Sequence, residues 1–181
     1  MLKPIDLLVG LKILSSDSSL TQMELATKLC LSSSQVNSAI KTLLAAKLLT
    51  LRHDKPFPVV VAMEEFVLSG VKYCYPAKIG ELTVGMPTAH AAEPLVQEII
   101  SNGDPVPVWP YVDGKVRGVA LEPLHKNVPK ALTEYPDPEL LIFLVLIDAL
   151  RIGRAREKTL AEKYLRQQFK KASARIEENY A

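Results

Sequence analysis

Residues 20–36 decide the fold, and they read LTQMELATKLCLSSSQV. The stretch contains two capping boxes, in which a hydroxyl side chain accepts from the backbone N–H three residues on and the later side chain reaches back. Thr21 and Glu24 form the first box, and Ser32 and Gln35 form the second. Because each box predicts the start of a helix, the stretch predicts a short helix, a tight turn and a second helix.

The residues around the predicted turn suit two helices that pack closely. Ala26 is small enough to let the helices approach, and Cys30 occupies the turn, where glycine is more usual. Leu31 fills the gap between the helices, and Val36 packs the second helix onto the core. An apolar stripe that begins after Pro4, with spacings of three and four, predicts one more helix ahead of the pair.

The outward positions of the second predicted helix are all polar, and none is acidic. These positions are Ser33, Ser34, Gln35, Asn37, Ser38 and Lys41. Near a helix N-terminus, hydroxyls, amides and backbone N–H groups meet phosphate oxygens and base edges together. We therefore predict that these side chains contact bases and phosphates of DNA. Either Gln35 or Asn37 suits a bidentate contact with adenine, and the sequence leaves the choice open.

The hydrophobic period changes after the second helix of the pair. Residues 50–53 predict a strand, residues 54–56 a turn, and residues 58–62 the returning strand of a β-hairpin. A hairpin directly after a recognition helix is a wing, and the polar side chains near its tip would contact the adjacent DNA backbone or minor groove. These side chains are Arg52, His53 and Lys55.

With these features, the first third of the chain resembles the winged helix-turn-helix regulators of bacteria, most closely the MarR-like group. The resemblance depends on residues 20–26, on Leu31 and Ser32, on Val36, and on the segment from Leu43 through the wing. It implies a sequence-specific, double-stranded DNA-binding transcriptional regulator. As a homodimer, the protein would read two half-sites about one helical turn apart. The alternative is that the winged helix serves only as a protein-docking module.

The middle of the chain predicts an α+β region with an interaction or sensing role. Its predicted elements are helices over residues 63–73 and 94–100, a loop over residues 77–92, a helix stop at residues 101–105, and a hairpin of residues 106–112 and 115–121 around Asp113-Gly114. Trp109 and Tyr111 give this hairpin an aromatic face. That face is explained either by core packing or by a pocket for a small molecule.

The sequence lacks the motifs of common enzyme classes. It contains no nucleophile elbow, no P-loop and no glycine-rich dinucleotide fingerprint. The three histidines, His53, His90 and His125, have no partner at metal-ligand spacing. We therefore expect neither enzymatic activity nor a metal or other cofactor.

A second resemblance covers the middle of the chain. Its segments are similar to a group of little-characterised bacterial regulators that are associated with nucleotidyltransferase-type toxins and have MarR-like N-terminal parts. The similar segments are residues 70–73, 76–77, 85–89, 107–110, 116–118 and 124–129. This resemblance implies an alternative function, in which residues 63–181 form an antitoxin-like module that neutralises a partner protein. Such a protein would also repress its own operon.

The tail predicts two helices. Residues 140–150 are apolar nearly all round, which is typical of a helix buried in the core or in a subunit interface. The second helix carries an apolar stripe made of Ala161, Leu165, Phe169, Ala172 and Ile176. The stripe would contact either a second copy in a homodimer or the core of the same chain. Arg151, Arg154 and Arg156 form a cluster suited to a phosphate or a carboxylate of a partner.

Charge divides unevenly along the 181 residues. The net charge is +3 over residues 1–62, −6 over residues 63–150 and +5 over residues 151–181. We expect an α+β, mainly helical protein in three parts: a winged helix-turn-helix DNA-binding domain over residues 1–62, an interaction or sensing region over residues 63–137, and a helical, dimerising region over residues 138–181. Basic ends around an acidic middle suit contact with a polyanion at the ends.

The sequence gives no sign of a membrane or secretory protein. The longest strongly apolar run, residues 140–147, is far shorter than the about 20 residues that cross a bilayer. The first residues lack a small-residue cleavage site, and Cys30 and Cys74 are too few for a disulfide scaffold. We therefore expect a cytoplasmic protein.

Overall fold

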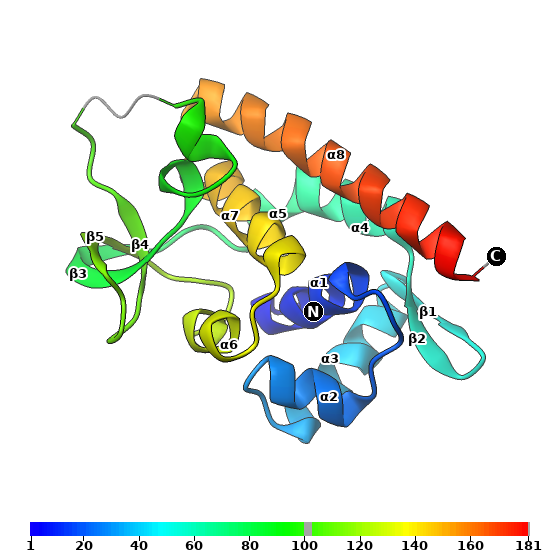
Figure 1. The fold of residues 1–181 in the computed structure, drawn as a ribbon. Helices are drawn as coiled ribbons and strands as arrows, with labels where there is room; N and C mark the ends of the chain where they lie inside the picture. The colour runs from blue at the N-terminus through cyan, green and yellow to red at the C-terminus, as the bar shows by residue number, and fades with distance from the viewer. Residues whose placement is uncertain (100–102, 181) are drawn as a thin grey trace.

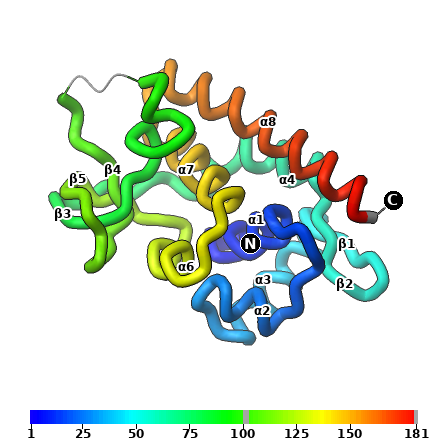
Figure 2. The backbone as a smooth tube through the Cα atoms, in the orientation of Figure 1, coloured from blue at the N-terminus to red at the C-terminus, as the bar shows by residue number. Residues whose placement is uncertain are grey.

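The computed structural model of the chain describes residues 1–99 and 103–180. The fold is α+β and mainly helical, as the sequence predicts. Figure 1 shows the N-terminal helices and a β-hairpin on one side of the molecule and a small sheet on the other. The long last helix runs along both parts, and its C-terminal end lies near the hairpin in Figures 1 and 2.

The N-terminal part contains α1 (Pro4–Ser15), α2 (Gln22–Lys28) and α3 (Ser33–Ala45). Both predicted capping boxes are present. The Glu24 N–H donates to the Thr21 hydroxyl at 3.2 Å, and the Thr21 N–H donates to the Glu24 carboxylate at 2.7 Å. Ser32 and Gln35 make the same two bonds at 3.2 and 2.9 Å. The two helices and the tight turn between them are therefore confirmed.

A β-hairpin follows α3, and it consists of β1 (Leu49–Arg52) and β2 (Lys55–Pro58) in antiparallel pairing. The turn residues are His53 and Asp54, whose φ angles are 50° and 59°. Positive φ at both central residues is typical of a two-residue hairpin turn, because its twist matches that of the strands. The predicted hairpin is confirmed, but its turn comes one residue earlier than residues 54–56.

A helical stretch replaces most of the predicted returning strand. It is made of α4 (Val60–Glu65), the π turn η1 (Phe66–Gly70) and α5 (Val71–Cys74). The helix expected over residues 63–73 is therefore confirmed, whereas the strand expected over residues 58–62 is wrong beyond Pro58. Met63, Val67 and Val71 are spaced by four residues and are fully buried. A helix places residues four apart on one face, and this is the face that the stretch buries.

Three strands form a small closed barrel: β3 (Ile79–Pro87), β4 (Pro107–Pro110) and β5 (Val116–Leu121). β3 is antiparallel to both other strands, and β4 is parallel to β5. The loop expected over residues 77–92 and the hairpin expected around Asp113-Gly114 are therefore wrong. Strands β4 and β5, on the two sides of Asp113-Gly114, pair in parallel, so they do not form an antiparallel hairpin.

Glycines explain how such a small barrel closes. A Cβ atom on Gly85 would lie 2.0 Å from the backbone oxygen of Trp109, and one on Gly114 would lie 2.4 Å from the Cα atom of Gly85. Neither position has room for a side chain, so the backbones approach closely at this point. In the sequence, the same glycines suggest a loop and a turn.

The remaining short elements are η2 (Ala89–Ala91), η3 (Leu95–Gln97) and α6 (Val128–Glu134). The helix predicted over residues 94–100 is only the short 3₁₀ turn η3. Residue 100 lies outside the described residues, as does part of the helix stop predicted at residues 101–105.

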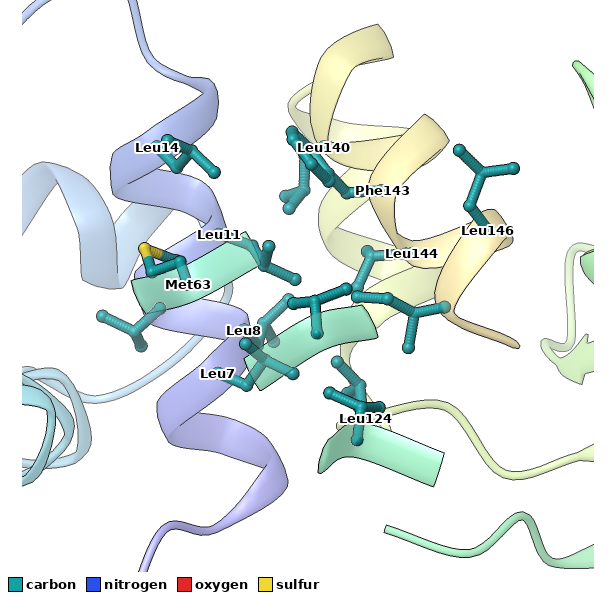
Figure 3. Packing of buried hydrophobic residues seen from close by; sticks show 14 of the residues in the cluster. Leu7, Leu8, Leu11, Leu14, Met63, Leu124, Leu140, Phe143, Leu144 and Leu146 are labelled. Atoms are coloured by element: carbon teal, nitrogen blue, oxygen red, sulfur yellow. The ribbon is translucent and has the colours of Figure 1, made fainter. Parts of the chain in front are cut away.

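Two long helices complete the fold: α7 (Pro138–Ile152) and α8 (Ala155–Tyr180). Helix α7 is buried between α1 and α8, and Figure 3 shows Leu140, Phe143 and Leu144 on the side of α7 that faces α1. The rings of Phe143 and Phe169 meet edge to face, with centroids 5.0 Å apart. The apolar stripe of α8 thus contacts the core of its own chain. In the described part of the chain, no helix is both long and apolar enough to cross a membrane.

Candidate nucleic-acid interface

The polar face of α3 is open to solvent. Its opposite face, with Val36, Ala39 and Leu43, is fully buried against the core. Of the six residues predicted on the polar face, Asn37 is half-buried and the other five, Ser33, Ser34, Gln35, Ser38 and Lys41, are exposed. The helix therefore presents the predicted set of side chains on one accessible surface.

Helices α2 and α3 form an open groove at this surface, with a volume of about 480 Å³. Its lining residues are Gln22, Ser33, Ser34, Asn37, Ser38 and Lys41. The lining contains no carboxylate, and Lys41 supplies a positive charge. Because hydroxyls and amides both donate and accept hydrogen bonds, this groove suits a ligand with phosphate oxygens and base edges.

The two amides of α3 have different surroundings. The Gln35 side-chain oxygen accepts from the backbone N–H of Ser32 at 2.9 Å and from its hydroxyl at 3.1 Å. A bidentate contact with adenine needs both ends of the amide, and capping already occupies one end of Gln35. Among the described residues, the Asn37 side chain forms no hydrogen bond, which leaves its amide available.

The hairpin places its three predicted residues at its tip. Arg52 and Lys55 are directly opposite each other, and His53 begins the turn between them. All three are exposed. The Arg52 guanidinium lies 5.2 Å from the centre of the Phe57 ring, and this contact orients the side chain along β2. Asp54 adds one acid to the tip.

The turn between α2 and α3 is held by a distant part of the chain. Cys30 has a φ of 52°, in the left-handed region that favours glycine. The Asn127 amide donates to the Cys30 carbonyl at 2.5 Å, and the Cys30 thiol donates to the Glu134 carboxylate at 3.5 Å. Burial and the neighbouring Glu134 raise the pKa of the Cys30 thiol, which keeps it protonated as the donor.

Sequence reasoning missed Asn127 and Glu134. They lie 97 and 104 residues from Cys30 along the chain. No short motif reports a contact over such a separation. The unusual residue in the turn was the one available signal, because a non-glycine residue at a left-handed position needs support from its surroundings.

The predicted arginine cluster does not exist as one surface. The Arg151 side chain is 4% exposed and pairs with Asp148 at 2.7 Å. It also donates to the backbone oxygens of Tyr75 and Glu122. The prediction that Arg151 contacts a partner is therefore wrong, because its donors are used inside the chain.

The other two arginines of the cluster lie at the surface, each with a different partner. Arg154 pairs with Asp104 at 3.1 Å, and Arg156 donates to the Glu98 backbone oxygen at 3.3 Å. These contacts fix the segment that leads into α8. They leave the two guanidinium groups apart rather than joined in a single anion site.

Asp148 is the centre of a buried network that joins the barrel to α7. It accepts from the Trp109 indole N–H at 2.6 Å and from the Thr88 hydroxyl at 2.8 Å. Burial raises the pKa of Asp148, while Arg151 and the two donors act in the opposite direction. Trp109 is 1% exposed, so its indole packs in the core.

The described residues contain no group of three His, Cys, Asp or Glu side chains that could hold a metal ion. Comparison of the sequence with protein-family models and with curated proteins, and of the structure with solved structures, gave no match. The functional argument therefore depends on the geometry of α3, the hairpin and their surroundings.

Proposed function

We propose that this protein is a sequence-specific, double-stranded DNA-binding transcriptional regulator with a winged helix-turn-helix domain. The observation that carries the proposal is the exposed, acid-free face of α3 beside a hairpin with basic residues at its tip. A helix of this kind fits the major groove of B-DNA, and a hairpin beside it reaches the neighbouring backbone.

The side chains divide into positioning and reading groups. Ser33, Ser34 and Ser38 would donate hydroxyl hydrogens to phosphate oxygens, together with backbone N–H groups at the start of α3. Lys41 would add a charge contact with phosphate. Asn37 would read adenine, because its amide is open at both ends while Gln35 is used in the cap.

The hairpin would fix the register of the protein on the duplex. Arg52 and Lys55 flank the turn and would contact phosphates beside the groove that α3 enters. His53 at the tip would lie against the backbone or in the minor groove. These contacts would raise affinity without reading sequence, so the base preference would come from α3.

We propose further that two copies bind together to a site with twofold symmetry. The apolar stripe of α8 is covered by the chain's own core, so the contact between copies would use another surface. In a symmetric pair, the two α3 helices would enter successive major grooves on one side of the duplex.

Selection of bound duplexes from a random pool, followed by mass measurement of the complex, tests these proposals together. We expect an enriched motif with two inverted half-sites, whose centres lie about 10–10.5 base pairs apart, and a mass of two chains per duplex. A pool without enrichment would contradict sequence-specific binding. Enrichment of one half-site with one chain would contradict the dimer alone.

A second candidate function is an antitoxin-like module that binds a partner protein, and the barrel surface favours it. Ile79, Leu82, Val84 and Val112 are 63%, 63%, 43% and 90% exposed. Large apolar side chains exposed together are typical of a protein-interaction surface. Both functions fit one protein, since the barrel and α3 are separate surfaces.

Co-purification with the product of a neighbouring gene distinguishes the two functions. The L82E/V84E double variant is expected to lose such a partner and to keep its duplex affinity. Replacement of the neighbouring exposed residues, as in E81Q/K115Q, serves as the matched control on the same barrel. Equal recovery of the partner by both variants would exclude the barrel surface as the docking site.

A further inference from the structure

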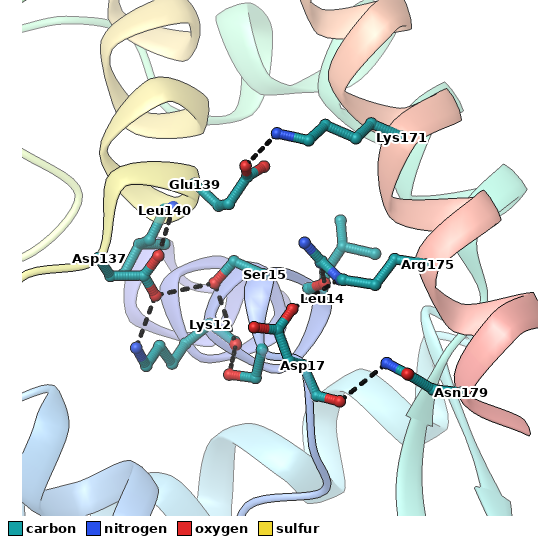
Figure 4. A network of polar contacts seen from close by, with 11 residues as sticks. Lys12, Leu14, Ser15, Asp17, Asp137, Glu139, Leu140, Lys171, Arg175 and Asn179 are labelled. Atoms are coloured by element: carbon teal, nitrogen blue, oxygen red, sulfur yellow. Dashed lines mark hydrogen bonds and ion pairs between the residues drawn. The ribbon is translucent and has the colours of Figure 1, made fainter.

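A polar pocket lies where the N-terminal helices meet the start of α7, and its volume is about 330 Å³. Its walls are the end of α1, residues 16–20 of the connection to α2, Lys28 of α2, and residues 136–139. Figure 4 shows the polar network at this junction, with Lys12 and Ser15 both directed toward Asp137.

Lys12 is the least exposed charged group of this pocket. Its side chain is 7% exposed, and its ammonium donates to a carboxylate oxygen of Asp137 at 2.6 Å. An ammonium has three N–H donors, and leaving a buried donor without an acceptor is costly. Within the described residues, Asp137 is the one acceptor of this ammonium, so two donors remain for a group in the pocket.

Asp137 is already fully used. One of its oxygens accepts from Lys12 and from the Ser15 hydroxyl, and the other accepts from the Leu140 N–H at 2.9 Å. Because this carboxylate caps α7 and binds Ser15, it cannot rotate to satisfy more of the Lys12 donors. The remaining donors of Lys12 are therefore available to a group in the pocket.

Each acid of the lining faces a cation, and one lysine of the lining forms no ion pair in the described residues. The other two acids of the pocket are paired with α8, Glu139 with Lys171 and Asp17 with Arg175. Lys28 is half-buried, lines the pocket and has no ion pair among the described residues. Each of the three acids thus faces a cation, and the charge of Lys28, which also acts on Glu24 of α2, remains available to an anion in the pocket.

We propose that this pocket binds a small organic acid, whose carboxylate accepts hydrogen bonds from Lys12 and Lys28. A singly charged carboxylate adds less negative charge beside Asp137 and Glu139 than a phosphate dianion would. The volume of about 330 Å³ leaves room for a small organic acid.

The position of the pocket makes the acid an effector. Its carboxylate would join α1 and α2 to the start of α7, and so would fix the helices that carry α3. This consequence rests on the proposed DNA binding, whereas the binding of the acid does not. By linkage, the factor by which the acid changes duplex affinity equals the factor by which the duplex changes affinity for the acid.

Titration of the ¹⁵N-labelled full chain with potassium acetate, in the absence of DNA, tests the site. We expect saturable amide shifts at residues 15–20, at Lys28 and at residues 137–140, and no such shifts with potassium chloride at the same ionic strength. Inorganic phosphate is expected to bind at least fivefold more weakly than acetate. Tighter binding of phosphate than of acetate would overturn the assignment to a carboxylate.

A lysine variant with a matched control decides between a built site and general attraction to cations. Lys28→Gln removes a pocket charge without removing a side-chain hydrogen bond or an ion pair found in the described residues, and we expect acetate affinity to fall at least fivefold. Lys47→Gln removes an exposed lysine outside the pocket and should leave the affinity unchanged. Equal affinity in both variants, or shifts that never saturate, would overturn the proposal.

The outcome is independent of the DNA proposal. Acetate binding is measured without a duplex, so a random pool without enrichment leaves this result intact. Conversely, a chain that selects a duplex but shows no saturable acetate shifts loses only the effector site. Amide spectra of Lys28→Gln without acetate confirm that the variant is folded.

Discussion

The N-terminal part and the barrel differ in the distances along the chain over which they are held together. The helix starts of the N-terminal part depend on bonds between residues three apart, such as those of Ser32 with Gln35. The barrel depends on bonds from Thr88 and Trp109 to Asp148, across 60 and 39 residues. The helix starts of the N-terminal part therefore follow from short sequence patterns. The barrel depends on contacts between distant residues, which no short sequence pattern indicates.

The largest expected effect on stability lies in the barrel and its contacts with Asp148. Asp148→Ala would leave the Arg151 charge buried without its partner and remove the acceptor of Trp109, and we expect the free energy of unfolding to fall by about 3–5 kcal/mol. Urea denaturation, followed by the fluorescence of the single tryptophan, measures this loss.

Asp113→Ala is the matched control, because Asp113 is an exposed acid beside the same barrel. It is expected to change stability by less than about 0.5 kcal/mol. If Asp148→Ala lowered the free energy of unfolding by a similarly small amount, the barrel would not depend on its hydrogen bonds to α7. The contrast between the two parts would then be wrong.

A smaller effect on stability is expected in the N-terminal part. Ser32→Ala removes the cap of α3, and we expect a loss of about 1 kcal/mol, since the N–H of Gln35 loses its acceptor. Circular dichroism during urea denaturation measures the loss. Ser34→Ala, which removes an exposed hydroxyl in the first turn of the same helix that takes no part in the capping box, should cost less.

The hydrogen bond from Asn127 to Cys30 sharpens the comparison, because it joins a distant residue to the turn between α2 and α3. Asn127→Ala removes the donor to the Cys30 carbonyl, and we expect duplex affinity to fall about threefold, consistent with the loss of one hydrogen bond. Fluorescence anisotropy with the selected duplex measures it. Thr133→Ala, in the helix that Asn127 precedes, is the control. Equal duplex affinity for the Asn127→Ala and Thr133→Ala variants would mean that the turn positions α3 without the bond from Asn127.

The smallest effect is a pH dependence at the first capping box. Bonds from the backbone and side chain of Thr21 lower the pKa of Glu24 below its ordinary 4.5. The ionised Glu24 therefore stabilises α2 above pH 4.5, and this contribution is lost as pH falls through the lowered pKa. NMR titration of the Glu24 side chain measures the shift, and Thr21→Ala should return the pKa toward 4.5.

The contrast between short-range and long-range contacts also explains which parts of the fold the sequence predicts. The helices that begin after Thr21 and Ser32 were predictable, since caps and apolar spacing act within one or two turns. The barrel was not, because Gly85 and Gly114 are typical of loops unless the opposing backbone is known. The apparent hairpin at Asp113-Gly114 failed for this reason.

The candidate site divides in the same way. The polar residues of α3 follow from helical periodicity, and five of the six predicted ones line one open groove, while Gln35 takes part in the cap. Arg151 was misjudged because its partner atoms on Tyr75 and Glu122 are 76 and 29 residues away. A cationic sequence cluster alone does not tell which of its members face the interior.

The salt dependence of duplex binding tests the central claim, that the face of α3 and the tip of the hairpin lie on DNA. For Lys41→Ala combined with Arg52→Ala, we predict weaker binding and a slope of log K against log salt that is less steep by about two, one for each lost phosphate contact. Lys163→Ala combined with Lys170→Ala removes two exposed charges of α8 and should leave the slope unchanged. Equal slopes in the two double variants would contradict the claim.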